Sequence, residues 1–120
     1  MADQSILDTT HLARMCMSDK EFMRELLVVM AVESRQLLTR LSTAAAAGDH
    51  DGAMRAAHTL RGAWANVGAK AGSEAMARAE EAAGAMCGPD ELARWSDSAE
   101  RAFRAIQREI DTLKLSVDPA

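Results

Sequence analysis

One short stretch of the chain, AAHTLRGAWANVG at residues 56–68, places a histidine, an arginine and a glycine close together. A neutral imidazole can act as a nucleophile, and His58 supplies an imidazole here. The guanidinium of Arg61 is suited to hydrogen-bond the oxygens of a phosphoryl group. A glycine in a helix interior, such as Gly62, makes the helix less stable than an alanine would, by about 1 kcal/mol. However, it also leaves bare backbone that another macromolecule can approach closely. These residues therefore have the types and spacing of a site that accepts a phosphoryl group.

The helical wheel of this stretch predicts that His58 faces solvent. A helix turns by about 100° per residue, so one side holds the residues that we assign to the core: Ala53, Ala56, Leu60, Ala63 and Val67. His58 lies almost opposite, on a face that it shares with Asp51, Met54, Arg55, Arg61, Gly62 and Ala65. We expect Met54, Arg55 and Ala65 to contact a docking partner. Two plainer interpretations stay open, in which Met54 is a stray surface methionine and Arg55 is a solvated charge.

The remaining histidines and cysteines offer weaker candidate sites. Asp49, His50 and Asp51 could be imagined as metal ligands, but adjacent side chains at the start of a helix diverge. Metal sites in helical bundles usually draw on Glu-x-x-His pairs, which this sequence lacks. Cys16 and Cys87 have neither the number nor the spacing of a disulfide framework or a metal knuckle. We therefore expect no metal site and two free thiols.

The composition favours a helical protein that binds neither nucleic acid nor a membrane. Strong helix formers, alanine above all, dominate, whereas aromatic residues make up only 3%. The net charge is −4, and the basic residues are scattered among acidic ones instead of forming a basic face. No apolar run approaches the roughly 20 residues that span a bilayer, and the N-terminal residues lack the pattern of a secretory leader. We expect a cytoplasmic protein with one domain over residues 1–120.

Apolar spacing and capping residues predict one short helix and four long ones. Ser18 and Glu21 form a predicted capping box at the start of the second helix, and Gly68 is suited to end the third. The expected ranges are about Thr9–Met15, Asp19–Ala47, Asp49–Gly68, Lys70–Ala85 and a last helix from Pro89. Because short turns join these helices, we predict an all-α, antiparallel up-down-up-down four-helix bundle with a short extra N-terminal helix.

The segment AHTLRGAWANVGA, residues 57–69, closely resembles the signature of histidine-containing phosphotransfer (HPt) domains. Arg61 and Val67 are mild substitutions, and the direct matches are Ala57, His58, Thr59, Leu60, Gly62, Ala65, Asn66, Gly68 and Ala69. The resemblance implies that His58 is the phosphorylated histidine and that Arg61 fills the position of the family's lysine. It also implies that Glu80 takes the place of a polar residue that can reach the imidazole. The family's four-helix bundle, with its short N-terminal helix, covers essentially the whole chain.

The sequence departs from the family pattern at positions of the predicted core. Trp64 stands where a small residue is usual, whereas Gly72 and Ala79 stand where leucine is usual. We expect Trp64 to fill the space that the smaller residues leave, so that core volume is roughly conserved. Glu80 is negatively charged, although it would lie beside His58, which the resemblance implies receives a negatively charged phosphoryl group. We expect it to orient the neutral imidazole of His58 through the nitrogen that does not react, and the sequence leaves open which nitrogen that is.

The resemblance implies a phosphorelay intermediate. A receiver domain of a hybrid histidine kinase or response regulator would pass a phosphoryl group from aspartate to His58, and another receiver would take it, reversibly. Mg²⁺ is expected on the receiver, and the chain, with no nucleotide-binding motif, is expected to be a monomeric phosphohistidine carrier without a cofactor or ATP-dependent kinase activity. Two alternatives stay open: a helical adaptor that binds a kinase or receiver without carrying phosphate, and a metal- or cofactor-binding bundle.

Overall fold

The chain folds into helices joined by short turns. The computed structural model describes residues 6–117, with side chains as far as residue 113. Its helices are α1 (Thr9–Met15), α2 (Lys20–Ala47), α3 (His50–Asn66), α4 (Lys70–Gly84) and α5 (Pro89–Val117). Every boundary predicted from the sequence lies within two residues of the observed one. The described residues contain no strand, so the all-α class is confirmed.

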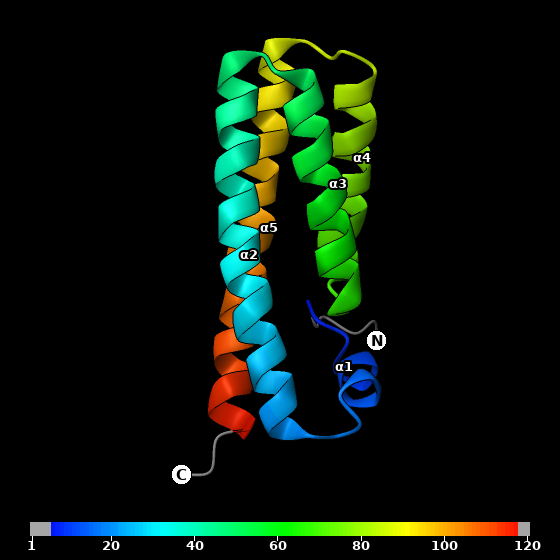
Figure 1. The fold of residues 1–120 in the computed structure, drawn as a ribbon, viewed down its shortest axis with the longest axis vertical. Helices are drawn as coiled ribbons and strands as arrows, with labels where there is room; N and C mark the ends of the chain where they lie inside the picture. The colour runs from blue at the N-terminus through cyan, green and yellow to red at the C-terminus, as the bar shows by residue number, and fades with distance from the viewer. Residues whose placement is uncertain (1–5, 118–120) are drawn as a thin grey trace.

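The four long helices form the predicted bundle (Figure 1). α3 packs against α2 and α4, and α5 packs against the same two helices. α3 and α5 therefore lie on a diagonal of the bundle. Because the connections are short, successive helices run antiparallel. α2 and α5 extend beyond the end of α3, and the short α1 lies beside that end and contacts α2.

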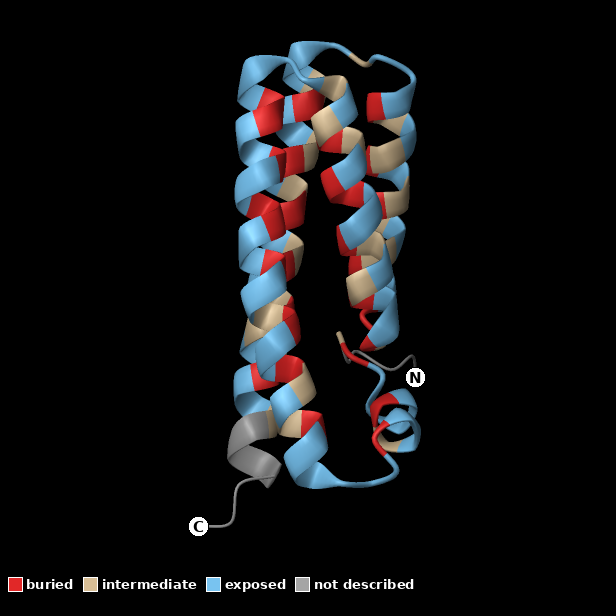
Figure 2. Cartoon of the chain, viewed as in Figure 1, coloured by how far each residue is buried: buried red, intermediate tan, exposed pale blue. Residues whose placement is uncertain are grey.

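The long helices turn their apolar stripes inward, so buried residues lie along the inner sides of the bundle (Figure 2). Most of the large side chains there are aliphatic, among them Leu27, Leu38, Leu41, Leu60, Ile106 and Ile110. Trp64 is fully buried with them. Within the described part of the chain, no helix is long and apolar enough to cross a membrane. This inward packing leaves the outer face of α3 to polar residues.

Asp19, rather than Ser18, caps the N-terminus of α2. The Asp19 carboxylate accepts a hydrogen bond from the backbone N–H of Phe22 at 3.1 Å, whereas Ser18 adopts a left-handed conformation with φ of 60°. The predicted capping box that began at Ser18 is therefore wrong, because Ser18 lies in the turn and the capping position belongs to the next residue. Asp49 caps α3 by accepting a hydrogen bond from the N–H of Gly52 at 2.9 Å.

The segment before α1 is tied to the turn between α3 and α4 and to α5. The backbone N–H of Asp8 donates to the carbonyl of Gly68 at 3.0 Å. The N–H groups of Ile6 and Leu7 donate to the two carboxylate oxygens of Glu109 at 3.0 and 2.9 Å. Gly68 has a φ of 76°, a left-handed conformation that glycine adopts without strain. The N-terminal segment therefore fixes the end of the helix that carries His58.

Candidate functional site

His58 lies near the middle of α3, on the face that points away from the core. Its side chain is 60% exposed, in agreement with the helical wheel. Ala57 and Leu60, close to it in the sequence, are fully buried against the neighbouring helices. Their burial fixes the rotation of α3 about its own axis, so the imidazole is accessible to another macromolecule.

A carboxylate from α4 holds one nitrogen of the His58 ring. Glu80 Oε2 lies 2.9 Å from His58 Nδ1, and Arg61 Nη2 lies 3.3 Å from the same nitrogen. A guanidinium only donates hydrogen bonds, so a bond from Arg61 would need an unprotonated Nδ1 whose lone pair also faced the carboxylate. The shorter contact, with Glu80, therefore assigns the proton to Nδ1.

This tautomer decides which nitrogen of His58 can react. When Nδ1 carries the proton of a neutral imidazole, the lone pair is on Nε2. Nε2 has no hydrogen-bond partner among the described residues. The site therefore presents Nε2 as an exposed, unblocked nucleophilic nitrogen. The sequence alone could not show whether Nε2 or Nδ1 would be the reactive one.

Arg61 is held beside the imidazole by the same carboxylate. Its Nε lies 3.5 Å from Glu80 Oε1, and its side chain is 42% exposed. The hydroxyl of Ser73, in α4, donates to the backbone carbonyl of Arg61 at 3.0 Å. Sequence reasoning missed Ser73, because a serine so far along the chain carries no signal for this contact. Arg61 is thus placed so that its guanidinium can reach an anion bound near His58.

Gly62 leaves open space one turn from His58. A Cβ added at this position would meet no neighbouring atom within 4 Å. Packing therefore gives no reason for a glycine, and the helix would accept a larger residue. The missing side chain leaves the outer surface of α3 open beside His58, so another molecule can reach the imidazole.

Two of the residues predicted to contact a partner, Arg55 and Ala65, lie on the outward face and are exposed. Arg55 pairs with Asp51 along the helix at 2.9 Å. Met54 is partly buried instead, because it packs against the core, and a Cβ added at Gly84 would lie 3.4 Å from its sulfur. Met54, predicted on the outward face, therefore lies at the flank of that face, where α4 partly covers it, and its contact with a partner stays a prediction.

The other two histidines contact backbone carbonyls. His11 Nε2 lies 3.0 Å from the carbonyl oxygen of Asn66, and His50 Nε2 lies 2.7 Å from that of Cys87. A protonated ring nitrogen would donate in each case, so both rings join parts of the chain that are distant in sequence. The described residues contain no group of three His, Cys, Asp or Glu side chains that could hold a metal ion.

The fold and the site define a class of small helical bundles in which an exposed histidine on an outward helix face is oriented by a carboxylate. Residues 25–115 match the family model described as the Hpt domain. The chain belongs to the Hpt family, whose function is histidine phosphotransfer in phosphorelays.

Among solved structures, the chain is similar to the crystal structure of histidine-containing phosphotransfer protein B (HptB) from Pseudomonas aeruginosa PAO1. The TM-score is 0.86 and the identity 22%, and the match covers 95% of this chain and 98% of that one. At this identity the likeness establishes the fold. The comparison with curated proteins gave no match.

Proposed function

We propose that the chain accepts a phosphoryl group on His58 from the phospho-aspartate of one receiver domain and passes it, reversibly, to another. The observation that carries this proposal is the 2.9 Å contact between Glu80 Oε2 and Nδ1 of the exposed His58, because it leaves Nε2 free to react. Membership of the Hpt family supports it. The receivers would belong to hybrid histidine kinases and response regulators.

The proposed transfer is an in-line displacement at phosphorus. The lone pair of Nε2 attacks, an N–P bond forms, and the bond between phosphorus and the aspartyl oxygen breaks. The aspartate leaves as a carboxylate, and the ring becomes a phosphoimidazolium that keeps its Nδ1 proton. In the second step, a carboxylate of the next receiver attacks the same phosphorus and neutral imidazole leaves.

In this scheme Glu80 stabilises the ring in both of its states. Its carboxylate accepts the hydrogen bond from Nδ1–H of the neutral ring, and it gains a charge-assisted bond when the ring becomes positive. The same negative charge repels a phosphoryl group from Nδ1. Glu80 therefore orients the ring and directs the reaction to Nε2.

Arg61 and Gly62 act on the approaching donor. The contact between Arg61 Nε and Glu80 Oε1 is long, at 3.5 Å, so the guanidinium can exchange it for a phosphoryl oxygen. Gly62 lets the phosphorylated surface come close to the ring. Phosphoryl transfer depends mainly on positioning and charge stabilisation. Gly62 contributes to the positioning of the donor, and Arg61 contributes to the stabilisation of charge.

The proposal assigns the remaining parts of the reaction to the partner. Mg²⁺ is expected on the receiver domain, and the chain carries the phosphoryl group without using ATP. We propose a monomer, because the four long helices bury one another's apolar stripes within a single chain. A cytoplasmic location stays a prediction from the sequence.

Labelling by a phosphorylated receiver tests the proposal. Receiver domains of the source organism are phosphorylated with radiolabelled acetyl phosphate, freed of the reagent and mixed with the chain. Wild type should acquire a label that is labile in acid and stable in base, as phosphohistidine is. His58→Gln should stay unlabelled, whereas the matched variants His11→Gln and His50→Gln should be labelled like wild type.

Two outcomes would contradict the proposal. In one, His58→Gln is labelled as strongly as wild type, so that another residue carries the phosphoryl group. In the other, no receiver labels wild type at all. If receivers bind the unlabelled chain, the helical adaptor becomes the better interpretation, and binding titrations with each receiver would identify it.

A further inference from the structure

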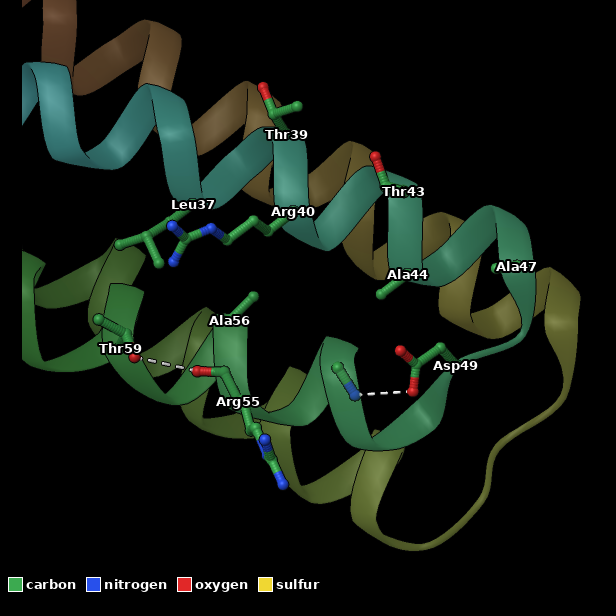
Figure 3. A pocket seen from close by; sticks show the side chains of 11 residues that line it. Leu37, Thr39, Arg40, Thr43, Ala44, Ala47, Asp49, Arg55, Ala56 and Thr59 are labelled. Carbon is green, nitrogen blue, oxygen red and sulfur yellow. Dashed lines mark hydrogen bonds between the residues drawn. The ribbon is translucent and has the colours of Figure 1, made fainter.

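A groove runs along the bundle between α2 and α3, beside the helix face that carries His58 (Figure 3). It encloses a volume of about 480 Å³. Its apolar floor comes from Leu37, Ala44 and Ala56, all buried, and its edges include Arg40, Thr43 and Thr59. Thr59 follows His58 directly in the sequence, so the groove begins within one residue of the phosphorylation site.

Arg40 gives this groove a positive charge that no residue of the described chain neutralises. Figure 3 shows its side chain lying between the two helices, directed toward Leu37. It has no ion-pair or hydrogen-bond partner among the described residues. Asp49 also lines the groove, but it lies at one end and caps α3 through the N–H of Gly52.

Arg55 extends the positive charge from the groove toward His58. Figure 3 shows its side chain leaving α3 on the side away from α2, and on the helical wheel it falls between the groove and His58. Its pairing with Asp51 joins two side chains that are 78% and 60% exposed, and such a pair is weak and readily rearranged. With Arg61, the outer surface around His58 therefore carries guanidinium groups on two sides, although the chain as a whole has a net charge of −4.

A protein that docks on His58 is large enough to cover the groove. A typical interface covers about 800 Å² on each partner, whereas the axes of packed helices lie only about 8–10 Å apart. The footprint must therefore extend from α3 over α2, over α4 or over both. Along α4 the exposed charges alternate in sign, through Lys70, Glu74, Arg78 and Glu81. The α2 side combines an apolar hollow with an unpaired cation, so it matches an anionic partner better.

We infer that the groove between α2 and α3 is a second docking subsite for the receiver domain, which takes an acidic side chain at Arg40 and an apolar side chain above Ala44 and Ala56. The inference rests on the proposed function, which supplies a partner whose reacting face carries a negatively charged phospho-aspartate. The groove then selects among receivers by the residues that flank this face, while His58 performs the transfer. Arg40 acts on binding and does not touch the reacting atoms.

Transfer kinetics separate this subsite from the reacting site. The receiver that labels wild type fastest is phosphorylated with acetyl phosphate, and the rate of labelling is measured against receiver concentration. Arg40→Glu should raise KM by about tenfold and leave the rate at saturation unchanged, because a charge at the rim of an interface affects docking more than chemistry. Arg104→Glu is the matched control, since Arg104 is exposed on α5, diagonally opposite α3. It should behave like wild type.

A second pair of variants tests the hollow itself. Thr43→Phe places an aromatic ring at the edge of the groove and should also raise KM. Ser42→Phe adds the same ring at the neighbouring residue, which is exposed but does not line the groove, and it should leave KM unchanged. Thermal unfolding of all the variants identifies any that fail to fold. Arg40→Glu removes no hydrogen bond or ion pair within the described chain, so it keeps the test valid if Thr43→Phe is unstable.

The outcomes distinguish this inference from the proposed function. Wild-type KM for both Arg40→Glu and Thr43→Phe, with wild type still labelled on His58, would overturn the inference alone. Absence of label on wild type would overturn the proposed function and the inference with it. Sedimentation of wild type without receiver tests a second copy as the occupant. A dimer that Thr43→Phe disperses would assign the groove to self-association and overturn the inference.

Discussion

The indole of Trp64 occupies the space that a side chain at residue 72 would need. A Cβ added at Gly72 would lie 2.9 Å from Trp64 Cε3, closer than such atoms approach in proteins. The indole cannot move aside easily, because its Nε1 donates to the hydroxyl of Ser34 at 2.9 Å and its ring stacks on Phe103. A large residue on α3 is thus compensated by the absence of one on α4.

This relationship predicts strong coupling between residues 64 and 72. Trp64→Ala should lower the free energy of unfolding by about 3–5 kcal/mol, because it empties a fully buried site. Gly72→Leu alone should also destabilise the protein, by about 1–3 kcal/mol, through overpacking. Together they should recover part of the loss, since leucine fills the space that the indole leaves. Urea unfolding of the four proteins measures the coupling, and additive losses would contradict it.

The compensation between the large Trp64 and the missing side chain at Gly72 could be predicted from the sequence, because volume in a close-packed core has to be conserved. The hydrogen bond between Trp64 and Ser34 could not be predicted. Helical spacing places Ser34 on the inward side of α2, but nothing in the sequence pairs it with an indole 30 residues away. The fold therefore follows from local patterns, whereas individual polar contacts depend on how the helices are rotated against one another.

Gly62 should be replaceable without loss of stability. Gly62→Ala adds a Cβ that meets no atom within 4 Å, so the higher helix propensity of alanine should raise the free energy of unfolding by about 1 kcal/mol. A longer side chain, as in Gly62→Gln, should slow transfer from a phosphorylated receiver while the fold stays intact. Thermal unfolding and the labelling rate, measured on the same samples, test both effects. Unfolding of Gly62→Gln would show that this glycine serves packing instead.

Gly68 should respond in the opposite way to the same substitution. Its φ of 76° is unfavourable for alanine, and an added Cβ would lie 2.9 Å from the backbone nitrogen of Asp8. Gly68→Ala should therefore destabilise the protein by more than about 1 kcal/mol. It should also loosen the segment before α1, which hydrogen exchange at the Asp8 amide would detect. Unchanged protection of that amide would contradict the close approach seen here.

The directions of the site residues could be predicted from the sequence, but their individual contacts could not. The outward direction of His58 and Gly62 follows from helical periodicity, because buried alanine and leucine residues fix the rotation of α3. The atom that Glu80 contacts does not follow, since it depends on the position of α4 relative to α3. The partial burial of Met54 does not follow either, because a wheel of one helix does not show which neighbour covers its flank.

The two cysteines should differ sharply in reactivity. Cys16 is 1% exposed, whereas Cys87 is partly exposed, so a thiol reagent such as dithionitrobenzoate should modify Cys87 first. The pKa of the Cys16 thiol is raised above its ordinary value of 9.0, mainly by burial and to a smaller extent by the negative charge of Asp19. The folded state therefore holds this proton more tightly than the unfolded state, and stability should fall as the pH rises above about 9. Cys16→Ala should reduce that fall, and an identical pH dependence would contradict the assignment.

Glu80 should act through the hydrogen bond that it accepts from Nδ1 of His58. Glu80→Gln offers an amide oxygen in the same position, so it should keep the Nδ1–H tautomer and much of the transfer rate. Glu80→Ala removes the acceptor and should slow labelling by about tenfold, as loss of a partner that orients a histidine typically does. Nitrogen-15 NMR of the imidazole measures the tautomer directly, which a purely structural role would not change. Equal rates for both variants, with the Nδ1–H tautomer kept in Glu80→Ala, would show that Arg61 and the helix position the ring without this carboxylate.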